Sequence, residues 1–216
     1  MNLLIIGAPG VGKGTMSRFL VAHYKLVHIS TGDMLRGAMK NKTEIGLKVQ
    51  EYMDAGNLVP DDIIHDMIVE RFSQKDINRG FLFDGYPRTV AQAIDLENIL
   101  KQLNMKIDAV LNLQLDDSII IKRITGRRTC PQCGSIFNIY YDPSKVENVC
   151  DNCGGELNIR GDDNEESLKI RLNEFAKNTA PVVDYYEKQN IVHNINADQE
   201  RDKEFGDIQK VLEGLK

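Results

Sequence analysis

The chain has 216 residues, of which 42% are hydrophobic and 27% charged, with a formal net charge of -5 and a pI of about 5.4. This length fits one core with insertions, and the acidic balance argues against a nucleic-acid backbone as the main partner, because such binding needs a basic surface. No apolar run approaches the ~20 residues of a membrane span and the N-terminus lacks signal-peptide features, so we expect a cytoplasmic protein without a membrane partner, where disulfides are uncommon.

The first fifteen residues combine a short apolar run with a glycine-rich loop. Residues 2–6 have no helical period and predict a buried parallel strand. Residues 7–14 predict a loop whose glycines let backbone N–H groups face a polyphosphate, with a helix after it and Lys13 adding a full charge. The hydroxyl at Thr15 comes one position later than in the common phosphate-loop motif, and a glycine-rich turn without a ligand is the alternative.

A second apolar run, residues 26–29, predicts another strand, and the polar turn after it offers Ser30 or Thr31 as a helix cap. Residues 34–55 carry only a thin apolar stripe, so we expect a weakly anchored and mobile lobe. An amphipathic helix is predicted to start at residue 61.

A third strand is predicted at residues 80–85 and ends in a carboxylate. Asp84 would lie where open α/β sheets bind ligands, and an aspartate there typically holds Mg²⁺ directly or through water. The alternative is an aspartate that only serves a turn. Arg88 follows in a stretch stiffened by a proline, before a helix predicted at residues 90–103.

The next predicted elements are a strand at residues 109–115 and a helix that starts at Asp116 and continues through Arg127. Arg123 and Arg127 are four residues apart on this helix, so we expect them to share one face. Two neighbouring arginines suit an anionic or aromatic partner, although a solvated basic face is the alternative.

The last third of the chain returns to helices and a strand. A helix is predicted from residue 164 and carries Arg171, Pro181 is expected to interrupt it, and a tyrosine-containing helix follows. Residues 191–195 predict a fifth strand and residues 200–215 a final helix. Strands alternating with helices imply a parallel sheet with helices on both faces.

All four cysteines lie in the irregular segment 128–161, as two C-x-x-C pairs separated by sixteen residues. This spacing is typical of a structural zinc site, and four thiolates would leave no open position for water. A segment with so few core residues usually needs a metal or a disulfide to hold it together. A redox pair or four unrelated thiols are the alternatives. The predicted ligands are Cys130, Cys133, Cys150 and Cys153.

Several arginines follow the phosphate loop along the chain and bring more positive charge than one nucleoside triphosphate needs. They suit two phosphorylated ligands that meet end to end, a reaction that needs no general base because the acceptor oxygen is already ionised. We expect the segments 30–59 and 127–164 to close over the site and exclude water. The histidines form no constellation, and we expect each to be a surface or satisfied core residue. The arginines are Arg36, Arg88, Arg123, Arg127, Arg160 and Arg171.

Four motifs resemble those of the adenylate kinase family in order and spacing, and the resemblance covers the whole chain. They are GAPGVGKGT at 7–15, STGDMLR at 30–36, FDGYPRT at 83–89 with Gln92, and GRR at 126–128. The delayed threonine is that family's own form of the phosphate loop. The resemblance implies an α/β P-loop kinase fold, with a five-stranded parallel sheet flanked by helices. It implies a core at 1–29, 60–126 and 165–216, an AMP-binding lobe at 30–59 and a zinc-binding lid at 127–164.

The resemblance further implies phosphoryl transfer from Mg-ATP to AMP giving two ADP, a structural Zn²⁺ and a monomeric protein. The implied catalytic residues are Lys13, Asp84, Arg88, Arg127, Arg160 and Arg171. For ATP the implied residues are Gly10, Val11, Gly12, Lys13, Gly14, Thr15, Arg123 on the adenine, Arg127 on the phosphates, Ile136, Phe137 and Gln199. For AMP they are Thr31, Arg36, Asn57, Leu58, Val59, Gly85, Tyr86, Pro87, Arg88, Gln92, Arg160 and Arg171. Asp33 is implied as a second carboxylate that orients Mg²⁺-bound water.

Three other functions are weighed against this one. A GTPase would carry a base-reading Asn-Lys-x-Asp motif, but residues 41–44 read NKTE and do not follow a buried strand. Another nucleoside monophosphate kinase differs only in the acceptor base, for which Thr31 and Gln92 favour AMP. A nucleic-acid-binding or protein-binding zinc ribbon is disfavoured by the acidic balance.

Overall fold

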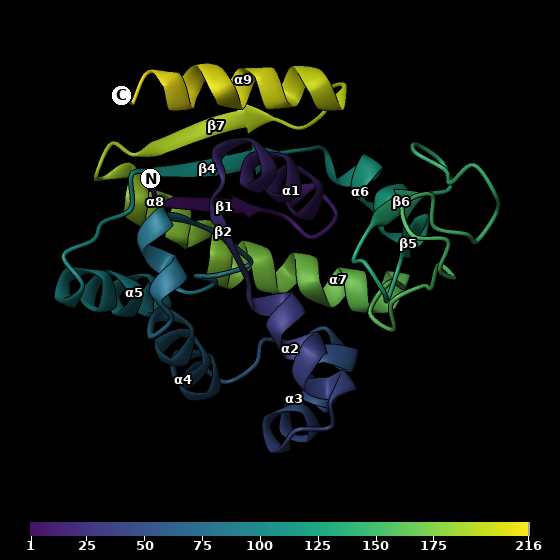
Figure 1. The fold of residues 1–216 in the computed structure, drawn as a ribbon, viewed down its shortest axis with the longest axis horizontal. Helices are drawn as coiled ribbons and strands as arrows, with labels where there is room; N and C mark the ends of the chain where they lie inside the picture. The colour runs from purple at the N-terminus through teal and green to yellow at the C-terminus, as the bar shows by residue number, and fades with distance from the viewer. Residues whose placement is uncertain (216) are drawn as a thin grey trace.

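The computed structural model describes residues 1–215, apart from the side chain of Asp117; Lys216, the last residue of the predicted core range, lies outside the described residues. A central parallel sheet has helices on both faces, and a helical pair and a lobe of short strands extend from it (Figure 1). In sheet order the strands are β2 (Val27–Ser30), β3 (Phe81–Asp84), β1 (Leu3–Gly7), β4 (Ala109–Gln114) and β7 (Val192–Asn196). The prediction of a five-stranded parallel sheet is therefore confirmed.

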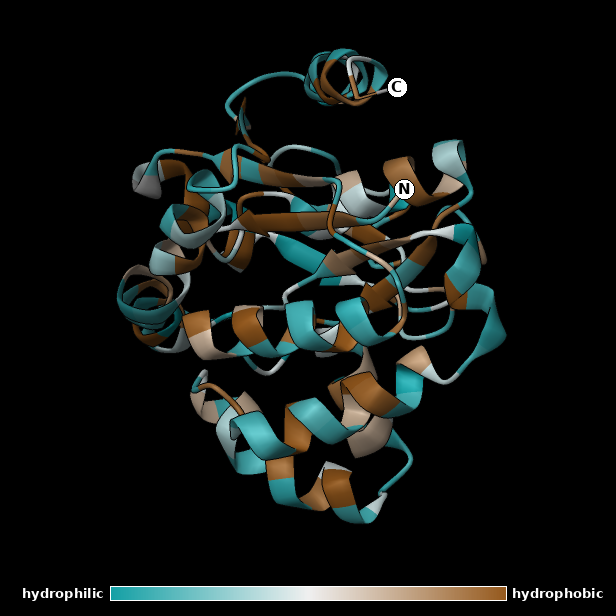
Figure 2. Cartoon of the chain, turned by 90° about the vertical axis from the view of Figure 1, so that its left-hand side faces the viewer, coloured by the Kyte–Doolittle hydropathy of each residue, from teal (hydrophilic) through white to brown (hydrophobic). Residues whose placement is uncertain are grey.

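The core forms two hydrophobic layers, because successive strand residues point to opposite faces of the sheet. Leu4 and Ile6 belong to the layer that includes residues of α4, α5 and α8, whereas Leu3 and Ile5 belong to the layer that includes residues of α1 and α9. Figure 2 shows the strands as mainly hydrophobic segments between helices of mixed colour. Burial on both faces is why these strands read as continuous apolar runs.

The helices start and end close to their predicted positions. Ser30 caps α2 as expected, since its hydroxyl accepts the backbone N–H of Asp33 at 3.3 Å. Asp116 caps α6 in the same way by accepting from Ser118 at 2.8 Å. The helices are α1 (Lys13–Tyr24), α2 (Thr31–Lys40), α3 (Glu44–Ala55), α4 (Asp61–Phe72), the 3₁₀ helix η1 (Lys75–Arg79), α5 (Val90–Gln102), α6 (Asp117–Thr125), α7 (Glu165–Glu174), the π-helical η2 (Phe175–Thr179), α8 (Ala180–Glu187) and α9 (Arg201–Glu213).

The prediction that the Asp116 helix continues through Arg127 is wrong. Helix α6 ends at Thr125, and Arg127 begins β5 (Arg127–Thr129), which pairs antiparallel with β6 (Ile136–Asn138). The side chain of Asn138 donates to the carbonyl of Arg123 at 2.9 Å, so a residue of the partner strand satisfies one of the last carbonyls of the helix. Arg123 and Arg127 therefore lie on different elements and share no helix face.

The expected interruption near Pro181 takes the form of a π-helical turn between two α-helices rather than a break in the helical backbone. Helix α7, the π-helical turn η2 and α8 follow one another with helical backbone at Phe175 and Ala180. Pro181 lies in the first turn of α8, where a missing N–H costs least, and the wider turn before it absorbs the lost hydrogen bond.

The strand order places a crevice at the carboxyl ends of the strands. Strands β2 and β3 lie on one side of β1, and the chain then crosses to β4 on its other side. Ligands bind at such a reversal in open α/β sheets. Gly7 ends β1, and Asp84 ends β3 opposite Ser30 of β2. Within residues 1–215, none of the helices combines the length and apolar character needed to cross a membrane.

Candidate active site

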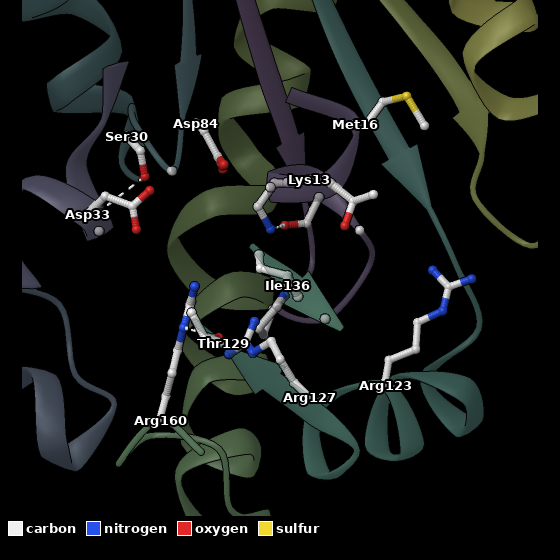
Figure 3. Close-up of a pocket in the computed structure, with 18 of the residues that line it drawn as sticks. Lys13, Met16, Ser30, Asp33, Asp84, Arg123, Arg127, Thr129, Ile136 and Arg160 are labelled. Atoms are coloured by element: carbon white, nitrogen blue, oxygen red, sulfur yellow. Dashed lines mark hydrogen bonds between the residues drawn. The ribbon is translucent and has the colours of Figure 1, made fainter. Parts of the chain in front are cut away.

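A cavity of about 1220 Å³ lies at these strand ends and reaches from the helical pair α2–α3 to the start of α9. Figure 3 shows Lys13 near its middle, with Asp33 and Asp84 on one side, Arg127 and Arg160 below, and Arg123 on the opposite side. The structure brings most of the predicted site residues to this one space, although they come from helices α1, α2, α6 and α7, strands β3, β5 and β6, and several loops.

The loop between β1 and α1 leaves its backbone open toward the cavity. Gly12 precedes α1 with φ of 118°, in the left-handed region that favours glycine. A Cβ at Gly10, whose φ is 85°, would lie 2.8 Å from the side chain of Ile124, so the loop packs against α6 without room for a side chain. The first N–H groups of α1 have no partner within the helix and carry its positive dipole end, which together form an anion site.

Lys13 lies half-buried beneath this loop, and its ammonium donates to the carbonyls of Gly7 at 2.6 Å and Ala8 at 2.9 Å. Burial lowers the pKa of Lys13 to about 7, although the nearby Asp84 acts in the opposite direction. Arg88, with Arg171 and Arg127, lowers that pKa further. A bound polyphosphate would reverse this balance and keep the ammonium charged.

Asp84 faces the phosphate loop from the end of β3. A Cβ at Gly14 would lie 3.6 Å from its Oδ2, and the Nε2 of His28 lies 3.8 Å from the same oxygen. His28 Nε2 is buried without a hydrogen-bond partner among the described residues, so the expectation that every histidine is a surface or satisfied core residue is wrong for His28. Its side chain lines the cavity and belongs to the surroundings of the carboxylate.

Two arginines at the cavity are held by a pair of consecutive aspartates. Arg127 forms a two-pronged ion pair with Asp163, whose side chain is fully buried, and Arg171 donates to Asp162 at 2.7 Å. A guanidinium with two donors on one carboxylate is fixed in orientation as well as in place. These two pairs fix both guanidinium groups at the cavity before any ligand binds.

Three further arginines lie close enough to act on one another. Burial lowers the pKa of Arg88 to about 10, with Arg171 as the next cause, and burial followed by Arg127 lowers the pKa of Arg160 to about 10. Arg88 is oriented by the carbonyl of Gly85, to which its Nε donates at 2.8 Å. Arginines that depress each other's pKa in this way are stabilised by an anionic ligand. The third is Arg36, which pairs with Asp33 on α2.

At the opposite end, Arg123 of α6 is held by backbone carbonyls. Its two terminal nitrogens donate to Val11 at 2.7 Å and Ala197 at 3.0 Å. Ile136 and Phe137 of β6 and Gln199 line the same cavity, and Ile136 lies next to Gly14 of the phosphate loop. Of the predicted ATP residues, Val11 has its side chain in the core and meets Arg123 through its carbonyl, whereas Gly10, Gly12, Lys13, Gly14, Thr15, Arg123, Arg127, Ile136, Phe137 and Gln199 line the cavity.

The predicted AMP residues divide between the main cavity and a much smaller one beside α2. The small cavity is about 20 Å³, enough for a water molecule but not for a purine. Gln92 lies there, 6% exposed, with its amide donating to Asp61 at 2.6 Å and accepting from the backbone of Arg88 at 2.7 Å. The small cavity is lined by Thr31, Asn57, Leu58, Val59, Gly85, Tyr86, Arg88 and Gln92, and the main cavity by Arg36, Leu58, Gly85, Tyr86, Pro87, Arg88, Arg160 and Arg171.

The four cysteines gather beside β5 and β6 with all sulfurs within 4.8 Å of one another. The Sγ atoms of Cys130 and Cys153 are 3.4 Å apart and those of Cys133 and Cys150 3.6 Å, too far for disulfides. Tetrahedral thiolates at ~2.3 Å from zinc are roughly 3.8 Å apart, so the set fits one metal ion. The glycine after each pair has φ of 73°, as expected for two sharp turns.

Sequence reasoning missed the two aspartates that orient arginines, and the buried Glu204 that also lines the cavity. The run of Asp162 and Asp163 directly after Arg160 was a usable signal, because consecutive carboxylates beside an essential arginine often pair with others. Glu204 gives no such signal, since one glutamate on an amphipathic helix is usually solvated.

Residues 5–191 match the family described as adenylate kinase. Over 215 residues, covering 100% of both sequences, the chain is 48% identical to an adenylate kinase of Bacillus cytotoxicus, 49% identical to one of Bacillus cereus and 48% identical to one of Geobacillus sp.. The chain belongs to the adenylate kinase family. The fold and the activity implied by its motifs are thereby confirmed: it is a nucleoside monophosphate kinase whose reaction is reversible phosphoryl transfer from ATP to AMP, giving two ADP.

Membership in the adenylate kinase family accounts for the shape of the cavity. A kinase that transfers a phosphoryl group between two nucleotides needs a long site, with positive charge concentrated at its middle, where the phosphates of the two nucleotides meet. The distribution found here is of that kind, with Lys13 and the arginines central and Arg123 at one end. The family also uses ATP, AMP and ADP as substrates, with magnesium bound to the triphosphate.

Proposed function

We propose that the end of the cavity next to Arg123 takes the donor, ATP. The phosphate loop and Lys13 would hold its phosphates, and the guanidinium of Arg123 would pack on the adenine opposite Ile136 and Phe137. The observation that carries this assignment is the position of Lys13, half-buried under a loop of open N–H groups, with arginines on the far side. Gln199 would contribute through its backbone at the base.

AMP, the acceptor, would lie on the other side of the arginines, toward α2 and α3. Arg88 and Arg36 would bind its phosphate, and Arg160 and Arg171 would bridge the phosphates of both nucleotides. The base would be read by Gln92, whose amide has the donor and acceptor that an adenine edge requires. A purine cannot enter the small cavity as it stands, so this assignment requires residues 30–59 to act as a separate lobe that moves on binding.

Magnesium would accompany ATP, and the oxygens of Asp84 and Thr15 are the hard ligands that it or its bound water prefers. Asp84 fits this role because it faces the phosphate loop from the end of β3. Asp33 is engaged by Arg36 and would act through water. The ion supplies charge neutralisation on the phosphates.

In the transfer step an AMP phosphate oxygen bonds to the terminal phosphorus of ATP, and the bond to the bridging oxygen breaks, leaving two ADP. No proton has to be removed, so the chain's task is to align both nucleotides and balance charge through Lys13, Arg88, Arg127, Arg160 and Arg171. Residues 127–164 would form a lid that keeps water from the terminal phosphate.

The metal in the four-cysteine site would be structural zinc, because four thiolates suit Zn²⁺ and leave no position for a substrate. Four unpaired thiols so close together persist in a reducing compartment, which supports a cytoplasmic location. We further propose a monomer, as the family resemblance implies.

The deciding experiment is a coupled assay of ADP formation from ATP with AMP, UMP, CMP or GMP as acceptor. We expect AMP to be preferred by kcat/KM, since Gln92 and Thr31 are placed to recognise its base. Absence of AMP-dependent ADP formation would contradict the proposed function. Preference for another monophosphate would leave the donor assignment standing and overturn the acceptor assignment.

A further inference from the structure

Glu204 is a buried acid that the reaction described above does not use. It lies in the first turn of α9, is 6% exposed, and its Oε1 has no hydrogen-bond partner within residues 1–215. Buried carboxyl groups are normally paired, because an unpaired one loses the hydration that it had in water. Glu204 is therefore not one of the solvent-facing charges of an amphipathic helix, and its burial needs another explanation.

The surroundings of Glu204 connect it to the donor end of the cavity, whose wall it forms together with Asp198, Gln199 and Arg201. Two cations act on its carboxyl: Arg123 from α6 and Arg201 from its own helix. Helix α1 also packs on α9 and brings Arg18, whose charge acts on Arg201.

Among the described residues neither arginine forms an ion pair with Glu204, and Arg123 has the larger electrostatic effect on its carboxyl. Arg201 is drawn outward, since it pairs with Asp142 of the loop after β6 and lies 5.8 Å from the ring of Phe19. Among the residues that the structure describes, Arg123 has only neutral carbonyls as hydrogen-bond acceptors, those of Val11 and Ala197. The anionic group that can balance its charge from α9 is therefore Glu204.

We propose that Glu204 is a positioning residue of the donor site, whose carboxylate attracts the guanidinium of Arg123 and so favours the position from which it packs on the base. This inference rests on the proposed function in one respect, the placement of the donor base against Arg123. It adds a residue that touches neither nucleotide in the assignment above and acts through a neighbour.

The sign of the effect follows from the charge of Glu204. Burial raises the pKa of Glu204 to about 7, although Arg123 and then Arg201 oppose the rise. Below that pH the carboxyl is neutral and Arg123 keeps only its two carbonyl contacts. Above that pH the carboxylate attracts the guanidinium and preorganises the surface on which the base packs. The affinity for the donor nucleotide therefore increases.

The test compares the KM for Mg-ATP of Glu204→Gln and of the unaltered protein at several pH values from 6 to 8. Lys13 and the nucleotide phosphates also titrate in this range, but they are common to both proteins and cancel in the ratio of the two KM values. We expect a ratio near 1 at pH 6, rising to about three- to tenfold at pH 8, with kcat and the KM for AMP unchanged. Glu213→Gln, at the exposed far end of α9, is the matched control and should give a ratio near 1 throughout.

A ratio that is the same at pH 6 and pH 8 overturns the inference, because a merely structural side chain would not follow the titration. Glu204→Met provides a second acid-free variant whose apolar side chain suits a buried site, so loss of folding in one variant does not end the test. If the unaltered protein formed no ADP from ATP and AMP, the proposed function itself would fail. ADP formation with a flat ratio would remove only the role of Glu204.

Discussion

Lys13 shows how one residue depends on charges brought together from the whole site. Its ammonium is half-buried and has two carbonyl acceptors, and desolvation lowers its pKa to about 7, far below that of a free lysine. A nucleotide phosphate supplies the missing negative charge. Binding of ATP near pH 7 should therefore be accompanied by proton uptake at this side chain.

Replacing Lys13 by methionine keeps the length of the side chain and removes its charge. We expect kcat to fall by about 10²- to 10³-fold, the usual cost of losing one preorganised donor to transition-state charge. The thermal unfolding temperature should not decrease, since a half-buried amine is replaced by an apolar group. Steady-state kinetics and a thermal melt measure both.

The control for this variant is Lys101→Met, an exposed position on α5 that makes the same chemical change away from the cavity. It should keep normal kinetics. Near-normal turnover of Lys13→Met would contradict the phosphate role of Lys13.

At the residue scale, the sequence was sufficient where a local motif carries the chemistry. The phosphate loop and the paired cysteines were visible because their spacing alone implies a ligand. The partners of the arginines were not, since Arg127 meets Asp163 from 36 positions away and only the folded chain brings them together. Glu204 was missed for the same reason, because its burial is a property of how α9 docks.

The lobe of β5, β6 and the cysteines is an element that cannot support itself by packing. Its buried apolar cluster consists of only four residues, two of which are the cysteines Cys130 and Cys150; the others are Phe137 and Leu157. The two glycine turns and the hydroxyl of Ser135, 3.1 Å from the sulfur of Cys133, prepare the thiols for a metal. Hydrogen bonds from Ser135 lower the pKa of Cys133 to about 6, so this thiol is readily ionised.

The purified protein is accordingly expected to contain one zinc ion per chain. Removing the metal with a chelator should lower the thermal unfolding temperature by at least about 5 °C, because a ligand bound only to the folded lobe is lost. The KM for ATP should rise, since Ile136 and Phe137 lie in that lobe. Metal analysis, thermal melts and kinetics on metal-free and zinc-restored protein check these outcomes; metal-free protein with an unchanged melt would refute structural zinc.

Element boundaries were predictable where caps or apolar runs mark them, as at Ser30, Asp116 and all five parallel strands. They were not predictable where tertiary pairing decides. Helix α6 stops before Arg127, where Asn138 of β6 donates a hydrogen bond to the carbonyl of Arg123. Pro181 is accommodated because a π-helical turn precedes it. The short strands β5 and β6 were missed since three residues each carry no periodic signal.

At the scale of the whole molecule, polar contacts away from the arginine cluster join the cysteine lobe to the core. Arg18 of α1 donates to the carbonyl of Gly134 at 2.9 Å, directly after a cysteine pair. Arg201 of α9 pairs with Asp142 in the loop after β6, with both side chains more than 40% exposed. All four residues line the cavity, and under the proposed lid role of residues 127–164 these contacts should be lost when the lobe moves away from the core.

The pair of Arg201 and Asp142 provides a test of that closure. An exposed ion pair contributes little to folding, but a pair present only in the closed form shifts the balance between closed and open forms directly. Arg201→Ala and Asp142→Ala should each raise the KM for ATP by about two- to fivefold, and the double variant should be no worse than either single one. Lys210→Ala, which removes an exposed ion pair within α9, serves as the control and should leave the KM unchanged.

Since Arg201 also acts on Glu204, the coupling between the two single variants is the informative quantity. Additive effects on the KM would mean that Arg201 acts through α9 alone and that the pair does not hold the lobe closed. Non-additive effects would assign the change in KM to the contact between Arg201 and Asp142.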